Sequence, residues 1–258
     1  MNGYGNMRKI LQYLIESPPG DVEFLVEPED NGVIPPPIPA RKVMPDWFKT
    51  LVPKIDGQDK LENSTIKRCA PFLDAMTMGW IIPLAADVEF ITNDGADDVK
   101  YKWKFYKNMV ENHNTKQVEG HSSLPKPPMK FLNYIYIKIP PGYSALFVPP
   151  LNRPDPRFQC IAGMVDDTYM GNGAFEYINF PFFFTQPKYT GIIKAGTPLV
   201  QLILIKRDQI QEQSERAIKV HTISSQDRAL VELTRRRRLS NESLYRNTLW
   251  HNAKGNKS

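Results

Sequence analysis

The sequence contains little of what disulfide frameworks and metal sites require. It has two cysteines in 258 residues, Cys69 and Cys160, too few for a disulfide framework and too far apart for a metal clip. Its four histidines form no His-x-Asp or His-x-x-x-His pair, and no cysteine lies near them. We therefore expect no metal site and no cofactor, and a reducing compartment fits the low cysteine content best.

Long hydrophobic runs and the common catalytic loops are also missing. No stretch of about 18 apolar residues occurs, and the N-terminus lacks a long apolar core and a small-residue cleavage site. We expect neither a membrane span nor secretion by a signal peptide. The sequence has no Gly-x-Ser-x-Gly elbow, Walker loop or Gly-x-Gly-x-x-Gly turn, so no nucleophile stands in a recognisable setting.

Positive charge is concentrated at the C-terminal end. The net charge is +5, but residues 206–258 hold twelve Lys and Arg against six acidic residues, which leaves the first 205 residues near −1. This tail predicts an acidic partner, such as nucleic acid or an acidic protein surface. The tail contains a run of four consecutive arginines. On a helix these would spread around more than one turn and could not all face one groove, so a solvated charge cluster remains the alternative. The run consists of Arg235, Arg236, Arg237 and Arg238.

Proline predicts an extended arm at the N-terminal end. Five prolines fall within residues 35–45, in the sequence VIPPPIPARKVMPDWFKTL. Proline fixes φ and has no N–H, so this segment is predicted to be extended and excluded from a sheet interior. Its apolar residues favour docking onto a surface over a solvated linker. We assign residues 1–63 to this arm, with a short helix over Lys9–Glu16 and a strand over Val22–Val26.

Residues 64–207 are predicted to form a β domain. Short strand-like runs alternate with turn sequences such as PPGY, NRPDP and AGTP. Tyr101 and Trp103, for example, alternate with Lys102 and Lys104, as in a half-buried strand. Eight or so such strands, after a short helix or turn in TIKRCAPFLDAMTMG, predict a mainly β fold, either a barrel or a jelly roll.

Residues 208–258 are predicted to form a basic helical tail. The composition changes there to helix formers, and Ser225 is a candidate N-cap that precedes a short apolar stripe. We therefore expect a C-terminal helix that contains the arginine run.

Three stretches, in order, resemble the signature motifs of the dUTP pyrophosphatase and dCTP deaminase superfamily. They are IPPGYSALFVPPLNRP (139–154), GMVDDTYMGN (163–172) and AGTPLVQLILI (195–205). The resemblance implies a dUTPase-like β-barrel with turn glycines at positive φ, and a homotrimer, since the related enzymes usually assemble that way.

The resemblance also implies roles for individual residues. Asp166 takes the position of the carboxylate that orients water and the sugar hydroxyl, Tyr169 that of the ring stacked on deoxyribose, and Gly171 that of the turn. Gln201 takes the position of a phosphate contact. Taken singly, Asp166 also fits a β-turn, Tyr169 rim packing and Gln201 a strand-end amide.

The phosphate-binding groups depart from the family pattern. Pro150, Leu151 and Asn152 replace an Arg-Ser-Ser sequence, and Arg153 stands one place late. Met170 replaces an arginine, and the arginine-rich helix stands where the family has a glycine-rich lid. Pyrophosphate hydrolysis needs cations and donors on the phosphates, and each charge-assisted contact contributes about 1.5–3 kcal/mol. We therefore expect a protein that is not catalytic, with Asn152 and Arg153 as the remaining ligand-binding candidates.

A second resemblance covers roughly residues 35–250. The sequences PARKVMPDWFKTL, TIKRCAPFLDAMTMGWIIPLAADVEF, NFPFFF and LYRNTLW resemble an uncharacterised family of large contractile-tailed phages. This resemblance implies a virion component, located in the virion or in the host cytoplasm. Extended arms gain stability by laying apolar side chains on another chain. The candidate anchors are aromatic: Trp47, Phe48, Tyr245 and Trp250.

Three functions follow from the sequence. The leading one is a non-catalytic structural or interaction protein of a phage particle, with a homotrimer and other virion proteins as partners and no membrane. The first alternative is an active nucleotide hydrolase or deaminase that uses Asp166, Tyr169 and Gln201. The second alternative is a nucleic-acid-binding accessory protein that acts through the basic tail.

Overall fold

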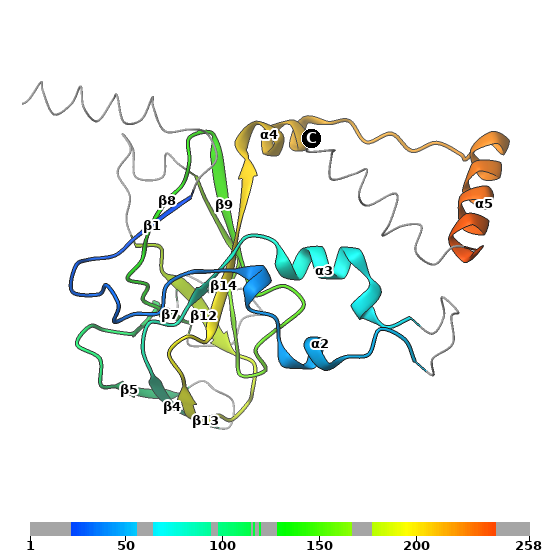
Figure 1. The fold of residues 1–258 in the computed structure, drawn as a ribbon. Coiled ribbons are helices and arrows are strands. Elements are labelled where there is room, and N and C mark those ends of the chain that lie inside the picture. Colours follow the sequence, from blue (N-terminus) through cyan, green and yellow to red (C-terminus); the bar gives the residue numbers. More distant parts are fainter. Residues whose placement is uncertain are drawn as a thin grey trace, which may run out of the picture. The chain divides into compact units, whose positions relative to one another are not determined.

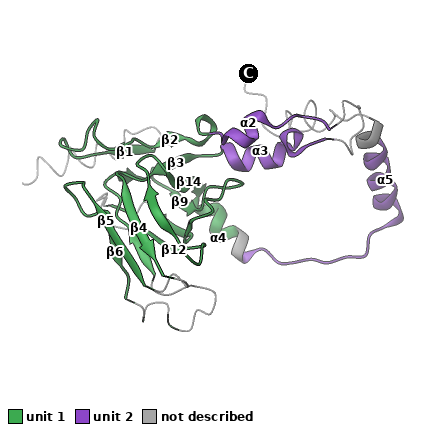
Figure 2. Cartoon of the chain, turned by 90° about the horizontal axis from the view of Figure 1, so that it is seen from below, with its two compact units in different colours: residues 1–43, 78–214 green, residues 44–77, 215–258 purple. Residues whose placement is uncertain are grey.

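The computed structural model describes residues 22–55, 64–93, 98–114, 116, 119, 128–166 and 177–240, without the side chains of 211, 213, 214 and 237–240. The described chain is mainly β, as expected (Figure 1). It divides into two compact units, residues 1–43 with 78–214, and residues 44–77 with 215–258 (Figure 2). The helix expected at Lys9–Glu16 lies outside the described residues.

A five-stranded antiparallel sheet contains one strand from each of the three motif stretches. Its order is β11 (Gly163–Asp166), β9 (Tyr143–Val148), β14 (Pro198–Lys206), β3 (Trp80–Pro83) and β2 (Ile38–Pro39). Proline can occupy β2 because an edge strand needs no outward N–H donor. The proline-rich sequence was therefore correctly excluded from a sheet interior.

Three smaller sheets complete the first unit. The four-stranded sheet has the order β10 (Phe158–Cys160), β12 (Phe180–Phe184), β7 (Met129–Phe131) and β6 (Val110–Asn112). The three-stranded sheet is β13 (Thr190–Ile193), β4 (Val88–Thr92) and β5 (Val99–Trp103), and the two-stranded sheet pairs β1 (Glu23–Leu25) with β8 (Tyr136–Lys138). The described strands keep open edges and do not close into a barrel.

More strands form than the eight or so that were expected. Among the described residues, twelve strands lie between residues 78 and 206, because several predicted runs divide in two. RFQCIAGMV, for example, forms β10 and β11, which belong to different sheets. The alternation predicted for Tyr101 and Trp103 is confirmed, since both are half-buried in β5 and Lys102 between them is exposed.

Aromatic side chains join the sheets in the core. In β12, Phe180, Phe182 and Phe184 are buried and the residues between them are half-buried, as a period of two requires. The ring centroids of Phe182 and Phe131 lie 3.8 Å apart. Phe90 of β4 lies 5.2–6.3 Å from the rings of Phe131, Phe182 and Phe184, so the core connects the three-stranded and four-stranded sheets.

Glycine is required at three of the turns. Gly142 in the PPGY turn and Gly196 in the AGTP turn have φ of 79° and 84°, which confirms the expectation of positive φ there. Gly79 has φ of 68°, and a Cβ at this position would lie 1.9 Å from the carbonyl oxygen of Leu202. The start of β3 can therefore approach β14 only through glycine.

Residues 22–43 belong to the body, which differs from the arm that was expected to end at residue 63. β1 pairs with β8 and β2 pairs with β3, and the 3-10 helix η1 (Ala40–Lys42) follows. Ile34 and Ala40 are only 5% and 0% exposed. Contrary to the expectation for an arm, this segment contributes to the core, because its extended backbone lies along sheet edges, where no outward N–H donor is needed.

The second unit contains short helices on the N-terminal side. They are α2 (Asp46–Thr50), the 3-10 helix η3 (Ile66–Arg68) and α3 (Ala70–Thr77), and α3 confirms the helix or turn expected before Trp80. Phe48 stacks on Phe72 with ring centroids 6.1 Å apart, and Trp47 meets Phe48 edge-on.

The C-terminal helix is confirmed. After α4 (Arg207–Glu215), α5 spans Ser225–Ser240. Its N-cap is Ser224, one residue before the predicted Ser225, because the Ser224 hydroxyl accepts a 3.0 Å hydrogen bond from the N–H of Asp227. That hydroxyl also donates to the Asp227 carboxylate at 2.6 Å, an arrangement similar to a capping box.

Candidate functional site

The three motif stretches converge on neighbouring strands. β9 lies between β11 and β14, so a strand from each of the three stretches takes part in one sheet. Asp166 pairs with Ser144 at one end of β9, and Gln201 pairs with Val148 at the other. The positions of Ser144 and Val148 are separated by about 13 Å along β9. One chain therefore brings Gln201 close to the loop with Asn152 and Arg153, but not to Asp166.

Gln201 holds two loops together. Its side chain is fully buried. The Oε1 atom accepts a 3.0 Å hydrogen bond from the N–H of Leu151, and the Nε2 atom donates a 2.6 Å hydrogen bond to the carbonyl of Met78. Both ends of the amide thus bind the backbone of the protein, so Gln201 has a structural role in this chain.

Arg153 and Asn152 also fit structural roles. The Arg153 guanidinium donates hydrogen bonds to the carbonyls of Val43 and Ala40, the latter at 3.4 Å. Burial lowers the pKa of Arg153 from its ordinary value. Asn152 has φ of 58°, a left-handed conformation that asparagine tolerates better than most residues. This loop therefore directs its cation toward residues 40–43.

Of the remaining candidate motif residues, the structure describes only Asp166. Asp166 is half-buried at the end of β11. Tyr169 and Gly171 lie outside the described residues.

The basic run lies on α5, as expected. Arg235 and Arg236 are exposed, and the Nε of Arg236 lies 3.1 Å from the Glu232 carboxylate, one turn earlier. The side chains of Arg237 and Arg238 lie outside the described residues.

The aromatic anchor candidates divide into two kinds. Trp47 is 45% exposed, which is compatible with an interface. Phe48 is 5% exposed and stacks on Phe72, so it contributes to packing within the chain. Tyr245 and Trp250 lie outside the described residues.

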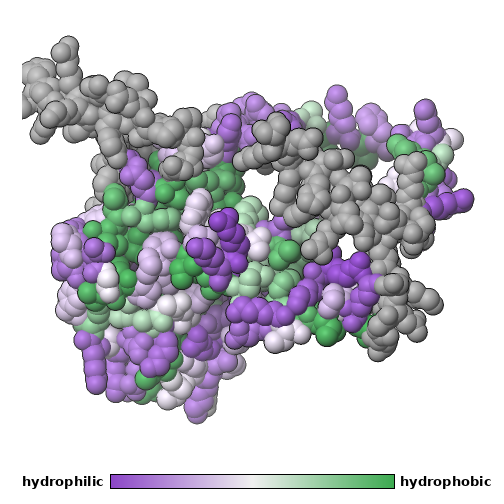
Figure 3. Space-filling model, in the orientation of Figure 1, coloured by the Kyte–Doolittle hydropathy of each residue, from purple (hydrophilic) through white to green (hydrophobic). Residues whose placement is uncertain are grey.

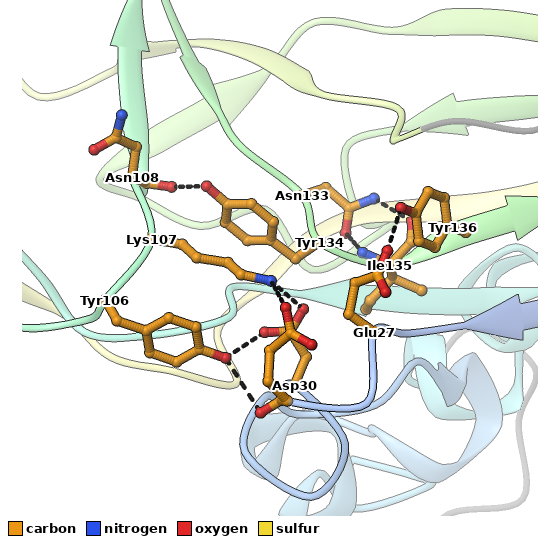
Figure 4. A network of polar contacts seen from close by, with 10 residues as sticks. Glu27, Asp30, Tyr106, Lys107, Asn108, Asn133, Tyr134, Ile135 and Tyr136 are labelled. Carbon is orange, nitrogen blue, oxygen red and sulfur yellow. Dashed lines mark hydrogen bonds and ion pairs between the residues drawn. The ribbon is translucent and has the colours of Figure 1, made fainter.

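An ionic cluster around a buried aspartate is the main polar feature that sequence reasoning missed (Figure 4). Asp30 is fully buried, and its carboxylate accepts hydrogen bonds from the ammonium of Lys107, at 2.7 Å, and from the hydroxyl of Tyr106. The Lys107 ammonium also lies 3.5 Å from the Glu29 carboxylate and 5.1 Å from the centre of the Tyr134 ring. No spacing rule connects these residues, because Asp30 and Lys107 are 77 positions apart.

A second group of contacts extends the cluster toward β1. The Tyr136 hydroxyl donates a 2.6 Å hydrogen bond to Glu27, and the Tyr136 ring stacks on Tyr177 with centroids 4.2 Å apart. Lys138 forms a 2.8 Å ion pair with Glu23. Residues 23–30 are thus connected to the body at three successive points.

The pKa shifts in this cluster oppose nucleophilic or general-base chemistry. The hydrogen bond to Asp30 raises the pKa of Tyr106, and the hydrogen bonds with Glu27 and Tyr177 raise the pKa of Tyr136. Burial lowers the pKa of Lys107, but the hydrogen bond and charge of Asp30, with the charge of Glu29, raise it overall. An activated lysine or tyrosine needs the opposite shift, so this cluster is best described as a structural anchor.

Neither metal-ligand groups nor membrane-spanning helices indicate a further site. Within the described residues, no group of three or more His, Cys, Asp or Glu could hold a metal ion, and no helix is long and apolar enough to cross a membrane. A comparison of the chain with models of known families and with curated proteins finds no match.

Proposed function

We propose that this chain is a non-catalytic structural or interaction protein of a phage particle, built on a dUTPase-like arrangement of strands. The observation that carries the proposal is a C-terminal segment with six large aliphatic side chains that are 45–92% exposed. They are Ile218, Val220, Ile223, Leu230, Val231 and Leu233. Complete burial of one such side chain contributes about 1.5–3 kcal/mol, so covering this segment with a partner is strongly favourable.

The exposed aliphatic residues lie among charged ones. In the space-filling view, hydrophobic and hydrophilic surfaces alternate over α5 (Figure 3). Apolar side chains surrounded by polar groups are typical of protein interaction surfaces. This pattern supports an interaction function for the tail.

The groups at the predicted phosphate positions support a non-catalytic protein. Gln201 and Arg153 bind backbone carbonyls and an N–H of the chain itself. A phosphate contact at either position would have to replace hydrogen bonds that hold these half-buried loops in place, and unsatisfied buried groups cost about 1–3 kcal/mol each.

The adjacency of the motif strands favours a second candidate function, nucleotide hydrolysis or deamination. β11, β9 and β14 are neighbours, and Gly142 and Gly196 have the positive φ that the motif turns require. These features support a dUTPase-like ancestry for the strands. They do not supply the missing phosphate donors, so we rank catalysis second.

A turnover assay tests the choice between these functions. The full chain would be incubated with dUTP, dCTP and other nucleotides in the presence of Mg²⁺, and the release of pyrophosphate or ammonia would be measured. We expect no turnover. Turnover that is lost in Asp166→Asn, but kept in the matched control Asp167→Asn, would contradict the proposal.

The virion role has its own test. Mass spectrometry of purified particles of the phage that this proposal implies should detect the chain together with other virion proteins. If the chain were present in infected-cell lysate but absent from particles, it would act in the cell and not in the particle.

A further inference from the structure

Two features of the chain are complementary: an exposed apolar segment without a β partner and an apolar sheet edge without a charged residue. We propose that residues 217–223 of one copy add as a strand to the open edge of β13 in a second copy. This inference rests on the proposed interaction function and specifies its partner.

The donor segment has the pattern of a strand. Residues 216–224, all of which are described, form neither helix nor strand. Ile218 and Val220 are 92% and 88% exposed, and the polar residues Lys219 and His221 alternate with them. In an extended chain, residues two apart point to the same face, so the two aliphatic side chains would share one face.

The acceptor is the open edge of the three-stranded sheet at β13. The other edge of this sheet, β5, carries the exposed Lys100 and Lys102, and lysines on an edge strand disfavour pairing with another chain. β13, with the sequence TGII, carries no charge, and no described strand pairs with its outer side. β13 is therefore the unprotected edge.

Exposed apolar side chains lie beside this edge. Ile192 of β13 and Ile91 of β4 are 44% and 45% exposed. Their partners in the ladder are Glu89 and Thr190, which places both isoleucines on the same face of the sheet. An added strand that presents Ile218 and Val220 on that face would extend this apolar surface beside Ile192, while its backbone would bond to the edge of β13.

The size of the donor segment favours a second copy as the occupant. Stable interfaces use about 20–30 residues on each side, and the extended segment with α5 supplies a stretch of that length. Leu230 and Leu233 lie three positions apart on α5, so they share one helix face. Each copy carries a donor segment and an acceptor edge, so identical chains can satisfy each other by symmetry. The tail (residues 206–258) has a net charge of +6, and the first 205 residues have a net charge near −1. The tail of one copy is therefore not repelled by the body of another.

The oligomeric state of the full chain tests the donor. Sedimentation velocity over a micromolar concentration series would compare the native protein with Ile218→Ser/Val220→Ser. We expect the dissociation constant of self-association to rise about 100-fold, since two buried aliphatic side chains are lost. The control Lys219→Ser/His221→Ser changes the same segment on its other face and should leave self-association nearly unchanged.

A matched pair of variants tests the acceptor. Ile192→Lys places on β13 the residue type that protects β5, and it should weaken self-association to a similar extent. Ile192→Val keeps the apolar edge and should behave like the native protein. Thermal melting of each variant separates lost association from lost folding. If association is unaffected by both the Ile218/Val220 and the Ile192 variants, the proposed contact is wrong.

A crosslink identifies the occupant directly. In a Cys69→Ser background, Val220→Cys and Ile192→Cys would be combined in one chain and oxidised mildly. We expect linked oligomers on a non-reducing gel. A link within single chains, a monomer at every concentration, or association that disappears after nuclease treatment would each overturn the proposal. Nucleotide turnover would instead contradict the proposed function and leave this contact unaffected.

Discussion

The ammonium of Lys107 lies 2.7 Å from the carboxylate of Asp30, which is completely buried and 77 positions earlier in the chain. The contact connects the turn after β1 to the loop after β5. Together with the Tyr136–Glu27 and Lys138–Glu23 contacts, it fixes the N-terminal segment to the body. Residues 23–30, which the sequence assigns to a docking arm, are thus held by charged and aromatic side chains from distant parts of the chain.

Replacing Asp30 by asparagine should strongly destabilise the protein. The change leaves the mostly buried Lys107 with only the more exposed and more distant Glu29 carboxylate as a charge partner, and breaking a buried pair in this way costs about 3 kcal/mol or more. The free energy of unfolding in urea measures this loss. Glu111→Gln breaks the more exposed 2.9 Å pair with Lys130 and should cost less than about 1 kcal/mol. Equal losses in the two variants would contradict a special role for Asp30.

The same cluster should make stability decrease at alkaline pH. The pKa values of Lys107 and Tyr106 are both raised in the folded state, so the folded protein holds protons that the unfolded chain releases. This contribution is complete below about pH 10, near the ordinary pKa values of tyrosine and lysine, and is lost as pH rises through the folded values. Urea unfolding between pH 8 and 11 should show a steeper decline for the native protein than for Asp30→Asn. Glu111→Gln should keep the native slope.

Local sequence patterns predicted the local structure well. The alternation of Tyr101 and Trp103 with lysines predicted β5, because a half-buried strand shows its period of two directly in the sequence. Gly142 and Gly196 marked turns for a similar reason, since positive φ favours glycine.

Long-range relationships could not be predicted in the same way. The motif position of Gln201 suggested a phosphate contact, but its amide bonds to Leu151 and Met78 depend on loops that the motif does not specify. The division of RFQCIAGMV between two sheets likewise depends on which distant strands pair with each half. Neither pairing leaves a periodic signal within the stretch itself.

Gln201→Leu should lower stability. Leucine has a similar size but leaves the Leu151 N–H and the Met78 carbonyl without their partner, and each unsatisfied buried group costs about 1–3 kcal/mol. Chemical denaturation would measure the loss. Gln159→Leu, at an exposed position of β10, is the matched control and should stay within about 0.5 kcal/mol of the native protein. An unchanged stability in Gln201→Leu would show that the amide is not structural.

Gly79→Ala should be more damaging than other glycine substitutions at positive φ. Its Cβ would lie 1.9 Å from the Leu202 carbonyl oxygen, so β3 and β14 would have to move apart. Gly142→Ala is the control, because Gly142 has a similar φ of 79° but nothing within 4 Å of the added Cβ. We expect the control to lose only the about 1–2 kcal/mol of left-handed strain, and Gly79→Ala to lose clearly more, in thermal or chemical melts. Similar losses would mean that the strands adjust easily.

The arginine run on α5 gives a separate prediction about nucleic acid. The tail is basic and the exposed Arg235 and Arg236 follow an apolar segment, so we expect weak binding to single-stranded and duplex DNA that falls steeply with salt, because counterion release drives it. Replacing residues 235–238 by alanine should abolish this binding in a fluorescence anisotropy titration. A control with four exposed lysines of the body replaced by alanine should retain it: Lys42, Lys100, Lys102 and Lys104. Affinity that does not change with salt would exclude this electrostatic mechanism, because contacts with phosphates necessarily displace counterions.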